Sequence, residues 1–76
     1  MKYEIVFDGV DTCYAMHGTK SLFSAYGASP DGAVYSCLGM LCDYLDADIN
    51  WDRDPLSEDI VKTLRKEGIK VSIKGV

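Results

Sequence analysis

Alternating apolar and polar residues predict β-strands at both ends of the chain. Residues 3–7 (YEIVF) alternate and run into an Asp-Gly pair, which is typical of a turn. Residues 12–17 are rich in β-favouring side chains and stop at Gly18, so we expect a hairpin partner for the first strand. Residues 69–74 (IKVSIK) alternate cleanly, which predicts a last strand with one buried face and one basic outer face.

Residues 19–27 fit two patterns. Every second residue from Ser21 to Ala25 would share one face of a strand. Leu22 and Tyr26, at helical spacing, would instead suit a short helix. We favour the strand, and the short helix stays open as the alternative.

Two helices are predicted in the middle of the chain, and each is preceded by a capping residue and a proline. Ser29 precedes residues 31–45, in which apolar side chains recur at helical spacing. Asp54 precedes residues 56–67, which show the same spacing. At both places we expect the side-chain oxygen to accept a hydrogen bond from the first helical turn, where the missing N–H of proline costs nothing.

These elements give the order β-β-(β)-α-α-β, in which the bracketed strand is the ambiguous segment. The order predicts an α+β fold, a small antiparallel sheet of three to four strands with two helices packed on one face. Residues 1–76 contain no repeat, linker or low-complexity tract, so a single domain is expected. A chain of this length has little room for both a core and a deep cleft, and we expect no enzymatic activity.

Cysteine usage and hydropathy bear on where the protein works. Cys13, Cys37 and Cys42 are an odd number, and free thiols in a reducing compartment suit them better than a disulfide framework. Their spacing from His17 does not suit a shared zinc ion. No apolar run approaches the roughly 18–20 residues of a membrane span. We therefore expect a cytoplasmic protein with no membrane partner.

Negative charge is concentrated between the two predicted helices. The net charge is −4, but seven of the twelve acidic residues lie between Asp43 and Asp59, where Arg53 is the only cation. Residues 43–59 therefore sum to −6, whereas residues 60–76 sum to +4. Clustered carboxylates repel one another unless a metal ion, a basic partner or salt water neutralises them. The overall acidic balance argues against direct binding of nucleic acid.

Aromatic residues accompany the acidic run and indicate a protein-interaction surface. An aromatic anchor ringed by carboxylates suits a basic protein partner, because charge speeds encounter and the ring supplies affinity. Spaced carboxylates also imitate nucleic-acid phosphates, so the partner could be a nucleic-acid-binding protein that this chain inhibits, by analogy with small acidic inhibitors carried by phages. The candidate partner-binding residues are Tyr44, Asp46, Asp48, Trp51, Asp52 and Asp54.

Other interpretations of the acidic run stay open. As an EF-hand-like loop over residues 48–59, it would make calcium the cofactor, with ligands Asp48, Asn50, Asp52 and Asp59. Arg53, however, stands at the sixth position, where glycine normally makes the sharp turn. The acids would alternatively only cap the second helix and keep the protein soluble. Separately, the edge of residues 69–73 offers pairing to a second copy in a homodimer.

Overall fold

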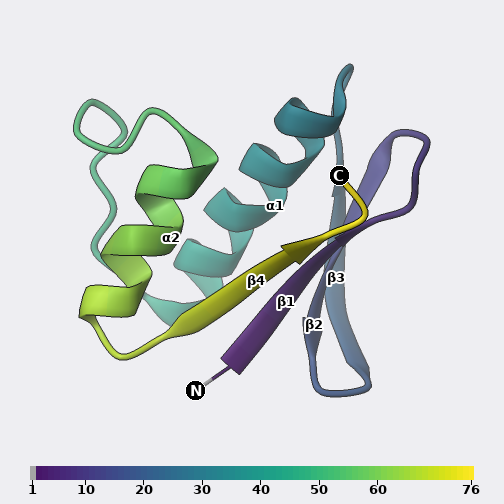
Figure 1. Ribbon diagram of the computed structural model, residues 1–76. Coiled ribbons are helices and arrows are strands. Elements are labelled where there is room, and N and C mark those ends of the chain that lie inside the picture. The colour runs from purple at the N-terminus through teal and green to yellow at the C-terminus, as the bar shows by residue number, and fades with distance from the viewer. Residues whose placement is uncertain (1) are drawn as a thin grey trace.

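The computed structural model describes residues 2–76, and its elements follow the predicted order (Figure 1). The α+β prediction is confirmed, and residues 19–27 hold a strand and not a helix. The elements are β1 (Lys2–Phe7), β2 (Thr12–His17), β3 (Lys20–Tyr26), α1 (Pro30–Leu45), α2 (Ser57–Lys66) and β4 (Lys70–Lys74).

The four strands form one sheet in the order β3-β2-β1-β4. The pairs β1–β2 and β2–β3 are antiparallel, whereas β4 runs parallel to β1. The parallel pair was not predicted. It follows from the path of the chain, because parallel neighbours need a long connection and the two helices lie within it. β4 lies at a sheet edge, so pairing with a second copy there stays a prediction.

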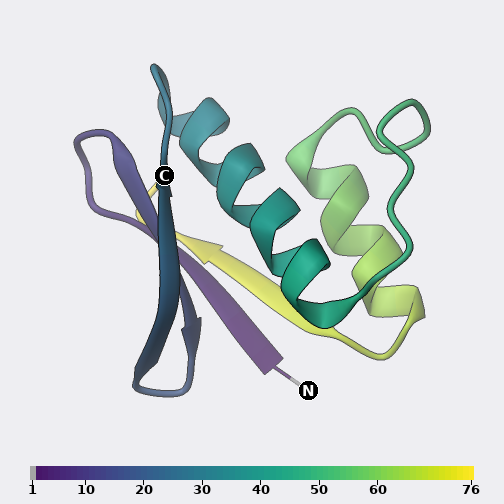
Figure 2. The same cartoon turned by 180° about the vertical axis from the view of Figure 1, so that it is seen from behind.

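Both helices cover the same face of the sheet, and their N-terminal ends lie at the same end of the molecule (Figures 1 and 2). Alternate residues of the strands point into the layer between sheet and helices. The fully buried side chains of this core include Ile5 and Cys13 from the sheet, Leu38 and Leu41 from α1, and Ile60 and Leu64 from α2. The two from α2 are the only buried residues of that helix.

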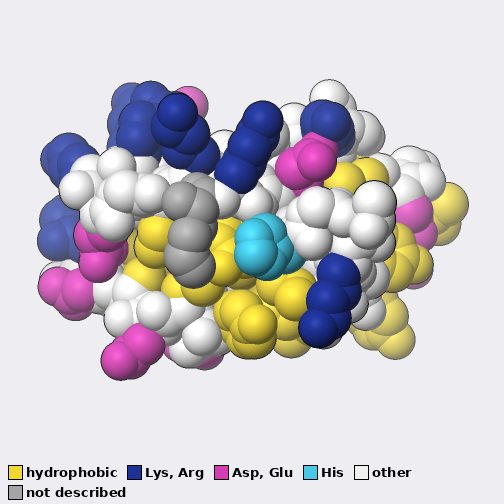
Figure 3. Space-filling model, turned by 90° about the horizontal axis from the view of Figure 1, so that it is seen from below, with side chains coloured by type: hydrophobic (Ala, Val, Ile, Leu, Met, Phe, Trp, Pro, Cys, Tyr) yellow, Lys and Arg dark blue, Asp and Glu magenta, His cyan; other side chains and the backbone are white. Residues whose placement is uncertain are grey.

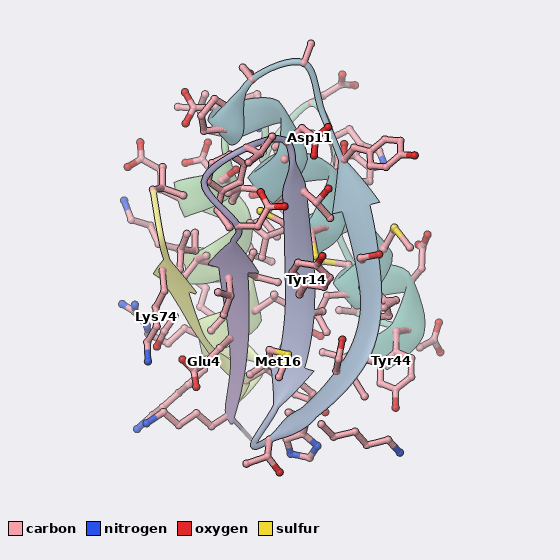
Figure 4. The ribbon with its side chains drawn as sticks, turned by 90° about the vertical axis from the view of Figure 1, so that its right-hand side faces the viewer. Glu4, Asp11, Tyr14, Met16, Tyr44 and Lys74 are labelled. Atoms are coloured by element: carbon pink, nitrogen blue, oxygen red, sulfur yellow. The ribbon has the colours of Figure 1, made fainter. Side chains whose placement is uncertain are left out.

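The opposite face of the sheet carries no helix (Figure 4). Tyr14 and Met16 lie near its centre, and Lys74 forms an ion pair with Glu4 at 2.6 Å. The bond to Lys74 lowers the pKa of the Glu4 carboxyl. Within residues 2–76, neither helix has the length and apolar composition to cross a lipid bilayer.

The two helices begin differently, although the sequence predicted an N-cap side chain before a proline at both. At α1 the prediction is confirmed, because the Ser29 Oγ accepts a hydrogen bond from the Gly32 N–H at 3.1 Å. At α2 it is wrong. The helix begins at Ser57 after Leu56, whose own N–H donates to the Asp59 carboxylate at 3.2 Å. Asp54 is not the cap, because its side chain turns inward.

Candidate interaction site

Residues 46–56 join α1 to α2 and carry most of the predicted site; we call them the connecting segment. The segment starts at the C-terminal end of α1 and runs along the outside of the molecule to the N-terminal end of α2, which lies at the opposite end of the helix layer (Figures 1 and 2). Asp46 ends α1 in a left-handed conformation with φ of 55°, and its N–H donates to the Asp43 carbonyl at 3.2 Å. Its carboxylate is exposed.

Asp54 anchors the connecting segment to α2. The residue is only 3% exposed, the one buried charged residue of the described chain. Its Oδ2 accepts from the Arg53 Nη2 at 2.8 Å and Nε at 3.1 Å, and its Oδ1 accepts from the Thr63 hydroxyl at 3.0 Å. The Arg53 guanidinium holds the pKa of Asp54 below its ordinary value, and the Thr63 and Asn50 hydrogen bonds add to this, while burial opposes it.

Asn50 shapes the turn that precedes this anchor. Its Oδ1 accepts from the Asp52 N–H at 2.9 Å and the Arg53 N–H at 3.0 Å. Its carbonyl accepts from the Asp54 N–H at 2.7 Å. An Asn side chain that bonds the backbone two residues later stabilises a turn without any ion. The segment therefore holds its shape through its own hydrogen bonds.

Trp51 packs this turn against α1. Its ring lies 5.5 Å from the Tyr35 ring, and the Tyr35 hydroxyl donates to the Asp54 carbonyl at 3.2 Å. The ring also lies over Gly39, where an added Cβ would stand 2.9 Å from it. A glycine inside a helix costs about 1 kcal/mol relative to alanine, and here it leaves space for the indole. Trp51 nevertheless remains 51% exposed.

The acids of the connecting segment divide into two groups. Asp54 is used internally, whereas Asp46, Asp48 and Asp52 are exposed and take part in neither ion pair found within residues 2–76. Arg53, the one cation of the acidic run, is ion-paired with Asp54 and forms no ion pair with these three carboxylates, although its charge also acts on Asp48.

A polar groove of about 470 Å³ lies between the connecting segment and α2. In it Lys62 and Lys66 share the lining with Asp48 and Asp59, so the negative charge is partly balanced on this side. Asp46 and Asp52 do not line it.

In Figure 3, most Lys and Arg side chains lie along the upper border of the view, while a group of Asp and Glu lies at the lower left. Folding therefore leaves the charge unevenly distributed.

Tyr44 lies away from the other predicted partner-binding residues. Its ring packs at 5.9 Å from Phe23 of β3 (Figure 4). It follows Tyr35 by nine positions on α1, which at about 100° per residue places the two rings on opposite sides of the helix. The structure therefore brings together Asp48, Trp51, Asp52 and Asp54 on the connecting segment and does not bring Tyr44 to them.

Two of the four predicted calcium ligands already accept hydrogen bonds from the backbone. Within residues 2–76, no group of three or more His, Cys, Asp or Glu side chains gathers as metal ligands would. The Asn50 Oδ1 accepts two backbone hydrogen bonds, and Asp59 accepts from the Leu56 N–H. In this structure both side chains therefore bond to backbone donors, and the calcium site stays a prediction.

Calcium is expected to leave the melting temperature unchanged. A ligand that binds only the folded state raises the melting temperature with concentration, by mass action. A thermal melt in millimolar calcium should therefore match a melt in chelator. An upward shift that grows with calcium concentration would show that the segment binds the ion.

The cysteines are poor candidates for chemistry. All three are free and buried. Burial raises the pKa of Cys37 to about 12 and that of Cys42 to about 11, so both stay protonated at neutral pH. His17 is exposed, and its ring packs against Tyr3 at 4.6 Å. A protonated, buried thiol neither attacks substrates nor ligates metal.

Sequence reasoning missed the inward role of Asp54 and the part that Thr63 plays in it. An Asp-Pro pair before a helical pattern fits an N-cap equally well, so the sequence held no reason to prefer the inward role. One signal was available for Thr63. It lies three positions after the buried Ile60, and helical spacing therefore places it beside the apolar face of α2.

Comparisons of this chain with models of protein families, with curated proteins and with solved structures give no match.

Proposed function

We propose that this chain is a small, non-enzymatic interaction module that binds a basic protein partner through the connecting segment. One observation carries the proposal. Arg53, the only cation of the acidic run, is committed to the buried Asp54, whereas Asp46, Asp48 and Asp52 face solvent without an ion pair among the described residues. Exposed carboxylates along one segment attract a basic protein over a distance of about 10 Å at moderate salt.

The local structure supports this role because the segment is already ordered. The Asn50 turn and the Asp54 bonds to Thr63 and Arg53 hold the backbone, so binding loses little conformational entropy in this segment. Trp51 offers a half-exposed ring that rests on α1. Tryptophan is enriched among the residues that contribute most to binding energy. The acids would steer the partner and the ring would hold it.

The partner class proposed is a cytoplasmic protein that binds nucleic acid through a basic surface. Asp46, Asp48 and Asp52 follow one another at short spacing, and such a row of negative charges competes for sites that receive phosphates. The proposed compartment is supported by the three free thiols, since a reducing environment keeps cysteines unpaired.

Competition with nucleic acid tests this proposal. The immobilised full chain is exposed to an extract of the cells that make it, and each captured protein is identified, purified and tested alone. We expect a protein with a basic surface, displaced from the chain by the nucleic acid that it binds and released by raised salt. A captured protein that binds this chain and its nucleic acid simultaneously, or with no dependence on salt, would contradict the proposal.

A further inference from the structure

An apolar groove of about 540 Å³ lies at the end of the molecule where both helices begin. Its walls come from the first turns of α1, the residues that lead into and begin α2, and two residues near the end of the chain, Ile73 in β4 and Val76 after it. The apolar lining residues are Val34, Tyr35, Pro55, Leu56, Ile73 and Val76. The groove is separate from the polar groove described above.

Three exposed apolar side chains meet in this groove. Leu56 is 55% exposed, Ile73 is 37% exposed and Val76 is 69% exposed. Leu56 also occupies the N-cap position of α2, where Ser, Thr, Asp or Asn would accept a hydrogen bond and leucine supplies none. Neither burial nor helix capping therefore accounts for a leucine at this position. Exposed apolar side chains that gather in one place are typical of a binding surface.

The charges around the groove have one sign. Asp31 and Glu58 belong to its lining, and none of its lining residues is Lys or Arg. Each of the two acids lies in the first turn of a helix. An apolar segment that carries Lys or Arg next to it would therefore match the groove in both polarity and charge.

The groove includes the last two residues of the connecting segment and lies next to the rest of it. Tyr35 lines the groove, and the same side chain contacts the Trp51 ring at 5.5 Å and donates to the Asp54 carbonyl. Pro55 and Leu56 continue the chain directly from Asp54 into the groove. A partner that covers Trp51 would therefore reach the groove without a break in the surface.

We propose that this groove receives a peptide segment of the basic partner, with an apolar side chain against Leu56 and Ile73 and a Lys or Arg beside Asp31 and Glu58. This assignment rests on the proposed function and names the second contact of the same partner. The connecting segment would attract the partner by charge, whereas the groove would bind one apolar anchor and fix the position of the partner on the module.

Selection of random displayed peptides on the immobilised full chain tests this assignment. We expect the enriched peptides to share an apolar side chain flanked by Lys or Arg. Leu56→Ser should lower the affinity for a synthetic version of the selected peptide by about tenfold or more, because an anchor contact is lost. This substitution suits the test, because serine at the N-cap with Asp59 three residues later forms a capping box, so α2 should be kept or stabilised.

Charge variants complete the test. Asp31→Asn and Glu58→Gln should each weaken binding of the same peptide, whereas Asp11→Asn, which removes the same charge on the sheet side of the molecule, should not (Figure 4). Peptides without basic residues, no enriched peptide, or equal binding to Leu56→Ser and the parent chain would overturn the assignment. Self-association of the chain that Leu56→Ser abolishes would also overturn it, because the groove would then belong to a second copy.

The same variants separate this assignment from the proposed function. If the captured partner loses affinity for the variant Asp48→Asn with Asp52→Asn but binds Leu56→Ser normally, the groove assignment fails and the proposed function stands. If the partner loses affinity only for Leu56→Ser, the connecting segment is not its charged contact, and the proposed function fails while the groove assignment stands.

Discussion

Replacing Leu64 by alanine is expected to lower the free energy of unfolding by about 2–5 kcal/mol. Leu64 is fully buried, and with Ile60 it is one of only two side chains that bury α2 in the core. Truncation removes apolar contacts and leaves a cavity that the neighbouring residues fill only in part. Domains have a total stability of about 5–15 kcal/mol, and a chain of this length lies toward the lower end, so the loss is a large share.

Urea unfolding measures this effect, and an exposed leucine provides the control. Leu56→Ala makes the same chemical change at a side chain that is 55% exposed, where alanine is no better or worse as an N-cap. It should change the stability by no more than about 0.5 kcal/mol. Equal losses for Leu56→Ala and Leu64→Ala would mean that α2 is not packed on the sheet as described.

Replacing Asp54 by asparagine is expected to release the connecting segment from α2 and to lower the melting temperature. Asparagine keeps the size of the side chain but removes the charge that Arg53 binds at 2.8 Å. The Arg53 guanidinium and the Thr63 hydroxyl then lose their acceptor or keep a weaker one. Faster hydrogen exchange at the amides of residues 50–56 would report the release.

The neighbouring Asp52→Asn is the matched control, because Asp52 is exposed and in no ion pair of the described residues. It removes the same charge two positions away and should alter neither the melting temperature nor exchange in residues 50–56. If Asp52→Asn and Asp54→Asn behave alike, the buried bonds of Asp54 do not hold the segment.

The pH dependence of stability gives a second readout of Asp54. Its pKa in the folded protein lies below the ordinary value of about 3.9, chiefly because of the Arg53 hydrogen bond, so folding favours its ionised form. This stabilisation is complete well above the ordinary value and is lost as pH falls through the folded pKa. Asp8 and Glu4 also have lowered pKa values, so they too contribute to acid sensitivity.

Melts over the acidic range should therefore show the parent chain losing stability as pH falls, and Asp54→Asn losing less. The variant would keep the contributions of Asp8 and Glu4, so its profile should flatten without becoming level. Identical pH profiles for the two proteins would mean that the ionised form of Asp54 is not favoured by folding.

Periodic patterns predicted the elements of the fold, because strand and helix spacing are local properties of a sequence. Residues 12–17 and residues 31–45 were placed within one residue of β2 and α1. The parallel pairing of β4 with β1 could not be predicted from local patterns, since it depends on where the chain returns after two helices. The ambiguous residues 19–27 became a strand because β2 offers them an edge to pair with.

The candidate site was predictable in composition but not in geometry. The count of acids correctly located an exposed anionic segment. It did not reveal that Asp54 turns toward Thr63, because their contact spans nine residues and depends on how α2 packs. Tyr44 was grouped with Trp51 by closeness in sequence, yet α1 places it on its other side against Phe23. The sequence did not predict the apolar groove, because its walls come from three separate parts of the chain.

The central claim is that the exposed acids of the connecting segment bind a basic partner. The affinity of the purified partner, measured by calorimetry, tests it with two charge-matched variants. Asp48→Asn with Asp52→Asn should weaken binding by about tenfold or more, because each exposed acid contributes to a highly charged interface. Glu4→Gln with Asp11→Asn changes the net charge equally and should bind as the parent chain does. Equal affinities for the two variants would contradict the claim.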